Sequence, residues 1–170
     1  MKIEKLIRDI PDFPKKGIIF KDIAPLLQDP AGFKYTVDQL VKHLEKVTPD
    51  VIVAVESRGF IFGAPVALKL GCSYVPVRKP GKLPYKTIEE EYQLEYGTDK
   101  LTMHTDAIKA GQKVAIIDDL LATGGTVAAT VKLVQQLKGN IVSIGFVIEL
   151  DFLNGREKLK DLPVFSLIHY

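Results

Sequence analysis

Two adjacent aspartates, Asp118 and Asp119, are followed closely by two glycines and two threonines in the segment 122–126. The apolar run 114–117 precedes the aspartates and predicts a buried strand, whereas the apolar residues after the two glycines are spaced as on one face of a helix. In an open α/β sheet, the carboxyl ends of the strands face the ligand. Segment 122–126 would therefore present backbone N–H groups and threonine hydroxyls at a helix N-terminus, which predicts a phosphate site.

The two carboxylates indicate what the phosphate is attached to. Carboxylates next to a phosphate repel it unless they bind hydroxyl groups or a cation, and the hydroxyls of a ribose can donate to both aspartates. A ribose 5-phosphate group therefore fits the segment. The chain has no G-x-x-x-x-G-K-[ST] motif for a nucleoside triphosphate and no G-x-G-x-x-G motif for a dinucleotide, so both of these ligands fit less well.

The elements that must position this segment alternate between apolar runs and amphipathic helices, a pattern typical of a parallel sheet flanked by helices. Asp29 and Pro30 are typical of a helix start, and a second helix is expected from about Phe60 to Gly71. A third helix is expected from Gly124 to just before Gly139. The expected strands are 51–55, 73–77, 113–117, 141–150 and 164–168. This predicts an α/β fold with an open, mostly parallel central sheet of about five strands.

Segment 78–100 breaks this alternation. It carries basic and acidic residues in equal number together with prolines and glycines, so it cannot form a buried layer. We expect an exposed hairpin or flap there.

The composition excludes several classes of protein. The 170 residues are 46% hydrophobic and 26% charged, which excludes a disordered chain and fits a single domain. The formal net charge of +2 is too small for binding nucleic acid or a membrane through bulk charge. Cys72 is the single cysteine and cannot form an internal disulfide, and the most apolar stretch, 60–68, is about half of the roughly 20 residues that cross a bilayer. We therefore expect a soluble cytoplasmic protein.

Residues 116–126, IIDDLLATGGT, resemble the phosphoribosyl pyrophosphate signature of the type I phosphoribosyltransferase family. Further blocks along almost the whole chain resemble the adenine phosphoribosyltransferases of that family. These blocks are 12–14, 20–23, 56–60, 78–84, 94–97 and 155–159. The resemblance implies transfer of a phosphoribosyl group from phosphoribosyl pyrophosphate to adenine, with Mg²⁺ held mainly by the substrate and no dedicated metal site.

The resemblance also implies roles for individual residues. The phosphoribosyl group would be bound by Asp118, Asp119, Ala122, Thr123, Gly124, Gly125 and Thr126. Pyrophosphate would be bound by Ser57, Arg58, Lys79 and Lys82. Arg58 and Glu95 would be catalytic, with Glu95 exchanging a proton with the adenine ring.

A hood formed by residues 1–28 would cover the base, and the flap 78–100 would close over the site. Phe20 would stack on adenine with Leu120 beneath it, while the backbone at Ile19 and Lys21 would read the edge of the base. The family often has arginine at the position of Lys21.

Two alternatives remain open from the sequence. One is a phosphoribosyltransferase for another purine base, and the other is a regulatory module that senses phosphoribosyl pyrophosphate. The resemblance further implies a homodimer, and the small net charge predicts that the protein binds no nucleic acid and no membrane.

Overall fold

The computed structural model describes residues 1–93 and 97–170, which form two compact units, Met1–Gln39 and Leu40–Tyr170. The first unit contains η1 (Ile3–Leu6), β1 (Arg8–Pro11), β2 (Ile19–Asp22), α1 (Ala24–Gln28) and most of α2 (Pro30–Leu44). β1 and β2 form an antiparallel hairpin. Asp29 accepts hydrogen bonds from the N–H groups of Gly32 and Phe33, which confirms the helix start that the sequence predicts there.

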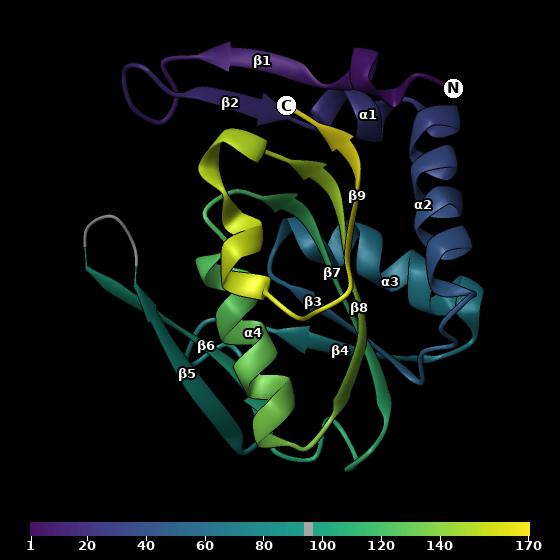
Figure 1. Cartoon of the computed structure of the whole chain (residues 1–170), viewed down its shortest axis with the longest axis vertical. Helices are drawn as coiled ribbons and strands as arrows, with labels where there is room; N and C mark the ends of the chain where they lie inside the picture. The colour runs from purple at the N-terminus through teal and green to yellow at the C-terminus, as the bar shows by residue number, and fades with distance from the viewer. Residues whose placement is uncertain (94–96) are drawn as a thin grey trace. The chain divides into compact units, whose positions relative to one another are not determined.

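The second unit is built on a five-stranded parallel sheet in the order β4-β3-β7-β8-β9 (Figure 1). Its strands are β3 (Val51–Val55), β4 (Ser73–Val77), β7 (Lys113–Leu121), β8 (Asn140–Glu149) and β9 (Val164–His169). Its helices are α3 (Arg58–Leu70), α4 (Gly125–Gln136) and the short η2 (Asp151–Leu153) and η3 (Gly155–Leu159). The predicted fold class is thus confirmed.

The sheet is apolar on both faces because helices pack on both. Val53 and Ile116 belong to the apolar cluster that includes Val127 and Leu133 of α4. On the other face, Gly63 of α3 lies against Ala54, and a Cβ at Gly63 would lie 2.6 Å from the Ala54 Cβ. Strand β3 is buried along its whole length, as an unbroken apolar run predicts.

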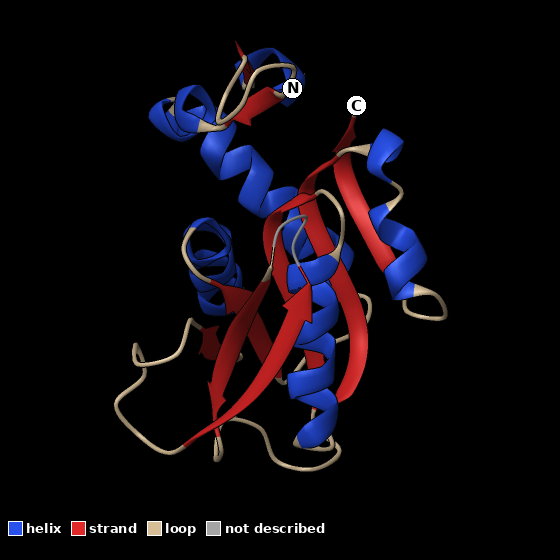
Figure 2. Cartoon of the chain, turned by 90° about the vertical axis from the view of Figure 1, so that its left-hand side faces the viewer, coloured by secondary structure: helices blue, strands red, loops and turns tan. Residues whose placement is uncertain are grey.

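The segment predicted as a flap forms an antiparallel hairpin of β5 (Thr87–Gln93) and β6 (Thr98–His104), which lies alongside α4 (Figure 1 and Figure 2). The exposed residues of β5 alternate with partly buried ones. The predicted boundary at residue 100 was too early, because Leu101 and Met103 continue β6 into the apolar core. Lys132 of α4 pairs with Glu90 of β5 at 2.8 Å and holds the hairpin against the helix.

Other boundaries also differ from the sequence prediction. β7 does not end at residue 117, because Asp118 and Leu121 remain paired in register with Phe146 and Glu149 of β8. α3 begins at Arg58 rather than near Phe60. Over the described part of the chain, no helix has the length and apolar character needed to span a membrane.

Candidate active site

The segment predicted to bind phosphate, residues 122–126, comprises the turn after β7 and the first two residues of α4, and is called the phosphate loop below. Gly124 adopts φ 77°, a left-handed conformation that favours glycine, and its carbonyl accepts a hydrogen bond from Ala128 as α4 begins. The first turn of α4 contains no acidic residue. The loop therefore presents a helix N-terminus without a nearby acidic residue from its own helix, which favours binding of an anion.

Asp118 and Asp119 lie at the carboxyl end of β7, immediately before this loop. Asp119 is 4% exposed, and its Oδ2 lies 2.9 Å from Nε of Arg58 at the start of α3. Burial and the neighbouring charge of Asp119 raise the pKa of Asp118 well above its ordinary value. Burial also raises the pKa of Asp119, although the Arg58 guanidinium opposes this. The ionised pair is thus costly in the free protein and calls for partners that donate hydrogen bonds.

The turn after β3 packs closely on the same strand end. A Cβ at Gly59 would lie 2.8 Å from Oδ1 of Asp118 and 3.1 Å from the carbonyl oxygen of Ile117. These separations are shorter than ordinary carbon–oxygen contacts, so the position has no room for a side chain. Gly59 therefore allows the turn that carries Ser57 and Arg58 to approach the two aspartates.

Glu56 connects this turn to the loop after β4. Its carboxylate accepts a hydrogen bond from Nε of Arg78 at 2.8 Å and another from the Lys79 N–H at 2.7 Å. Burial raises the pKa of Glu56, but these two hydrogen bonds outweigh it and hold the pKa below its ordinary value. The Lys82 N–H in turn donates to the Lys79 carbonyl. Residues predicted to bind pyrophosphate thus lie on two loops that Glu56 ties together.

Lys79 pairs with an acidic residue of the β5–β6 hairpin. Its Nζ lies 2.8 Å from Oδ2 of Asp99, and this hydrogen bond raises the pKa of Lys79 and lowers that of Asp99. The Tyr92 hydroxyl lies 3.4 Å from the same Asp99 oxygen, and a Cβ at Gly125 of the phosphate loop would lie 3.4 Å from the Tyr92 ring. The hairpin therefore contacts both the predicted pyrophosphate loop and the phosphate loop.

The residues predicted to contact the base belong to both units of the chain, unlike those predicted to bind the phosphate groups. Leu120 lies on β7 next to Asp119. Ile19, Phe20 and Lys21 lie on β2 in the first unit, where the Phe20 ring contacts Phe13 edge-on and Lys21 pairs with an aspartate of β1. Glu95 lies outside the described residues. Its predicted catalytic role stays a prediction, as do the base-binding roles.

Sequence reasoning missed several residues that the structure places near these loops. Glu56 precedes two residues predicted to bind pyrophosphate, and Asp99 lies in the segment predicted as a flap. No local pattern reveals the basic partner of either residue. Lys158 of η3 was also not singled out, although its Nζ would lie 4.0 Å from a Cβ at Gly125. Its place within the family-like block 155–159 is the signal that could have found it.

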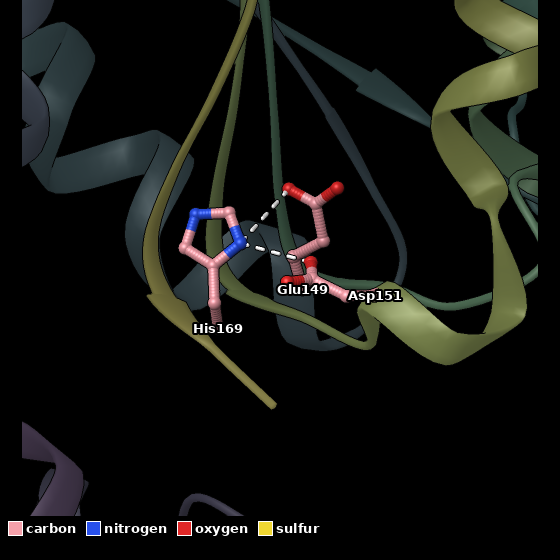
Figure 3. A group of neighbouring side chains, drawn as sticks. All are labelled: Glu149, Asp151 and His169. Atoms are coloured by element: carbon pink, nitrogen blue, oxygen red, sulfur yellow. Dashed lines mark hydrogen bonds and ion pairs between the residues drawn. The ribbon is translucent and has the colours of Figure 1, made fainter.

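A separate polar cluster lies at the ends of β8 and β9, where His169 points toward Glu149 and Asp151 (Figure 3). The His169 Nδ1 lies 2.9 Å from Asp151 Oδ1 and 3.8 Å from Glu149 Oε2. Both Glu149 oxygens are already engaged, since Arg156 donates to each and Ser166 donates to Oε2. The cluster is therefore an ion-pair network rather than a site suited to a metal ion.

Comparison with known proteins places this geometry in context. Residues 27–168 match the family model described as a phosphoribosyl transferase domain. An adenine phosphoribosyltransferase from Alkaliphilus metalliredigens is 59% identical over the full length of both chains.

Solved structures agree with this sequence match. The adenine phosphoribosyltransferase of Thermoanaerobacter pseudethanolicus is similar with a TM-score of 0.97 and 56% identity, covering 99% of this chain and 98% of that one. The enzyme of Saccharomyces cerevisiae, solved with an imino-altritol bisphosphate and adenine, is similar with a TM-score of 0.94 and 45% identity, covering 98% and 96%.

Proposed function

The chain belongs to the phosphoribosyltransferase family, and we infer from its site and its relatives that it transfers the 5-phosphoribosyl group of phosphoribosyl pyrophosphate to adenine. The products are AMP and pyrophosphate, so the reaction salvages a purine base. The observation that carries this function is the ion pair between Arg58 and Asp119, at 2.9 Å. It brings a turn predicted to bind pyrophosphate against the aspartates predicted to bind the ribose.

The phosphoribosyl group is assigned to β7 and the loop that follows it. The N–H groups of residues 122–126 and the hydroxyls of Thr123 and Thr126 would bind the 5-phosphate. Asp118 and Asp119 would accept hydrogen bonds from the ribose hydroxyls. This assignment is supported by the burial of Asp119 and the partial burial of Asp118, because a charge withdrawn from water requires donors.

The leaving pyrophosphate is assigned to Ser57, Arg58, Lys79 and Lys82. Breaking the bond at the anomeric carbon leaves positive charge on the ribose and increases the negative charge on pyrophosphate. Donors that are already placed where this negative charge develops stabilise the transition state. The link from Glu56 to the N–H of Lys79 supports this assignment, since it fixes one of these loops relative to the other.

Magnesium is proposed as the metal that accompanies the substrate. The carboxylates of Asp118 and Asp119 are oxygen donors of the kind that Mg²⁺ prefers, and the ion commonly keeps water and phosphate ligands. Within the described residues, the one close group of three or more possible ligand residues is the Glu149 cluster, in which both Glu149 oxygens accept hydrogen bonds from Arg156. The donor set thus fits an ion held mainly by substrate, which would neutralise charge on pyrophosphate when bound.

The base is assigned to Leu120 and to the hood formed by residues 1–28, with Phe20 stacking on adenine and Ile19 and Lys21 reading its edge. Glu95 is proposed to exchange a proton with the ring. The hairpin within the flap 78–100 is proposed to close over the site, which excludes the water that would otherwise react with the ribose cation. The enzyme is further proposed to act as a cytoplasmic homodimer of single-domain subunits, as the family resemblance implies.

Product analysis with a panel of bases tests this function. The purified chain is incubated with Mg²⁺, phosphoribosyl pyrophosphate and one base at a time: adenine, hypoxanthine, guanine, xanthine, uracil or orotate. Nucleotide is expected with adenine alone. Formation of nucleotide from another purine instead would identify the chain as a phosphoribosyltransferase for that base. Binding of phosphoribosyl pyrophosphate without formation of any nucleotide would favour a regulatory module.

A further inference from the structure

The segment η3, Gly155–Leu159, packs directly against the phosphate loop, although the family resemblance gives it no role. A Cβ at Gly124 would lie 2.5 Å from the carbonyl oxygen of Gly155. A Cβ at Gly155 would overlap the carbonyl oxygen of Ala122. Because both contacts are made by backbone atoms, neither position tolerates a side chain unless the phosphate loop or η3 moves.

Arg156 holds this segment in place from the neighbouring position. Its Nε lies 2.6 Å from Glu149 Oε1 and its Nη2 lies 2.8 Å from Glu149 Oε2, a two-pronged ion pair. Its Nη1 also donates to the carbonyl of Val164 at the start of β9. Arg156 therefore connects η3 to the ends of two strands of the sheet.

Glu149 lies beside the origin of the phosphate loop. It is 4% exposed and stands in register with Leu121, the last residue of β7. The N–H of Leu150 donates to the Leu121 carbonyl at 2.9 Å, which anchors the strand ends to each other. The phosphate loop is thus bounded by β7, by β8 and by η3. The Arg156–Glu149 ion pair holds η3 against the loop.

We propose that Arg156 and Glu149 are positioning residues that hold Gly155 against residues 122–126, so that the loop is preformed for the 5-phosphate of the substrate. The proposal rests on the proposed function of that loop. Binding by several N–H groups requires them to converge, and displacement of a positioned group by about 1 Å can cost a factor of 10² in rate. Rupture of the pair would leave Glu149 buried with fewer donors and release the segment.

A general loss of stability would also follow from breaking an ion pair whose carboxylate is buried, so the test needs a readout specific to the phosphate. Arg156→Gln, Arg156→Lys and Gly155→Ala are compared with the unaltered protein. The matched control is Ile108→Ala, which removes buried apolar contacts near the start of β7, at the other end of the strand. For each variant, melting temperature, kcat, the KM for each substrate and the Kd for AMP and for pyrophosphate are measured.

We expect Arg156→Gln and Gly155→Ala to raise the KM for phosphoribosyl pyrophosphate and the Kd for AMP about tenfold or more, with the KM for adenine and the Kd for pyrophosphate within twofold. Arg156→Lys keeps the charge and should restore part of the loss. Ile108→Ala should lower the melting temperature without changing either phosphate-dependent constant. If Arg156→Gln does not fold, the proposal is tested by the same constants measured for Arg156→Lys and Gly155→Ala.

The proposal is overturned if these variants lower the melting temperature while the KM for phosphoribosyl pyrophosphate stays within twofold. It is also overturned if the KM for adenine and the Kd for pyrophosphate rise by the same factor as the KM for phosphoribosyl pyrophosphate. Failure of the proposed function is distinct from this result, because the unaltered protein would then form no AMP at all.

Discussion

The Arg58 guanidinium lies against the Asp119 carboxylate, with 2.9 Å between Nε and Oδ2, and so joins the start of α3 to the end of β7. The ion pair is largely buried on the side of Asp119, which is 4% exposed. Charges on a helix and on a strand are therefore oriented relative to each other before any substrate binds. Such preorganisation is the source of electrostatic stabilisation in enzymes, because the donors need not rearrange during the reaction.

Removal of this ion pair should reduce turnover. Arg58→Gln deletes a donor near the developing charge of pyrophosphate and releases Asp119, so kcat should fall by roughly 10²-fold. Steady-state kinetics of AMP formation measures the effect. Lys34→Gln serves as the control, since it removes a cation from an exposed ion pair with Asp38 on α2. An Arg58→Gln variant with unchanged kcat would refute the assigned role.

Asp118→Asn should stabilise the free protein while impairing catalysis. The pKa of Asp118 is raised above its ordinary 3.8 by burial and by Asp119. The free energy of unfolding therefore falls as pH rises from about 4 through the raised pKa of the folded state, because ionisation is disfavoured there. The asparagine removes this loss. At pH 7 the melting temperature of Asp118→Asn should be higher than that of the unaltered protein, by roughly 2–4 °C per kcal/mol gained. Its kcat/KM should drop roughly 10- to 100-fold, because the variant loses the charged hydrogen bonds to the ribose hydroxyls.

Thermal melts of both proteins between pH 4 and pH 8 check this sign. The advantage of Asp118→Asn should shrink as the pH falls toward 4, where Asp118 of the unaltered protein is protonated. An advantage that grows toward low pH would show that Asp118 is stabilising in its ionised form.

Gly59→Ala should damage the site more than its effect on stability explains. The new Cβ would lie 2.8 Å from Asp118 Oδ1, so the aspartate or the α3 turn must shift. Gly63→Ala is a matched control one turn along the same helix, where the new Cβ would meet Ala54 at 2.6 Å. Overpacking of this kind costs about 1–3 kcal/mol at either position.

The kinetic constants should separate the two glycine variants. Gly59→Ala should raise the KM for phosphoribosyl pyrophosphate about tenfold, whereas Gly63→Ala should leave it within twofold. Equal effects of the two substitutions on this KM would mean that the close approach to Asp118 has no bearing on substrate binding.

Asp99→Asn should strengthen binding of phosphoribosyl pyrophosphate. In the ligand-free protein Asp99 pairs with Lys79 at 2.8 Å, and the pyrophosphate group must displace it to use this lysine. Because exposed ion pairs contribute little, the KM should fall by roughly two- to fivefold. Lys79→Gln should raise the same KM, by about tenfold.

The hairpin supplies its own control for this prediction. Glu89→Gln releases Lys100 from a similar exposed ion pair at 2.7 Å, and should leave the KM for phosphoribosyl pyrophosphate unchanged. A rise of the KM in Asp99→Asn would contradict the competition and indicate that Asp99 orients Lys79 for binding.

Much of the fold follows from patterns that act locally. The apolar run 51–55 was predicted with its observed bounds, because a strand buried on both faces has no polar residues to obscure it. The edge strand 73–77 was also predicted with its observed bounds. β7 was predicted too short, since Asp118 and Asp119 resemble a loop in sequence. The pairing of Asp118 and of the last residues of β7 with β8 depends on a neighbour that lies far along the chain.

The candidate site likewise contains one part that could be predicted from the sequence and another that could not. The phosphate loop could be predicted because its glycines, threonines and aspartates are contiguous. The partners Arg58–Asp119, Glu56–Arg78 and Lys79–Asp99 could not, because each joins residues from different elements. A charged residue carries no local sign of its partner, so only the folded chain reveals which loops are tied together.

The most direct test of the account follows pyrophosphate and AMP from phosphoribosyl pyrophosphate and adenine, comparing the unaltered chain with the Asp118→Asn/Asp119→Asn double variant under identical conditions with Mg²⁺. The account predicts equal amounts of both products from the unaltered chain, and at least a 10²-fold loss of rate in a double variant that remains folded. Equal rates of AMP formation in the two proteins would contradict the assignment of the ribose to β7.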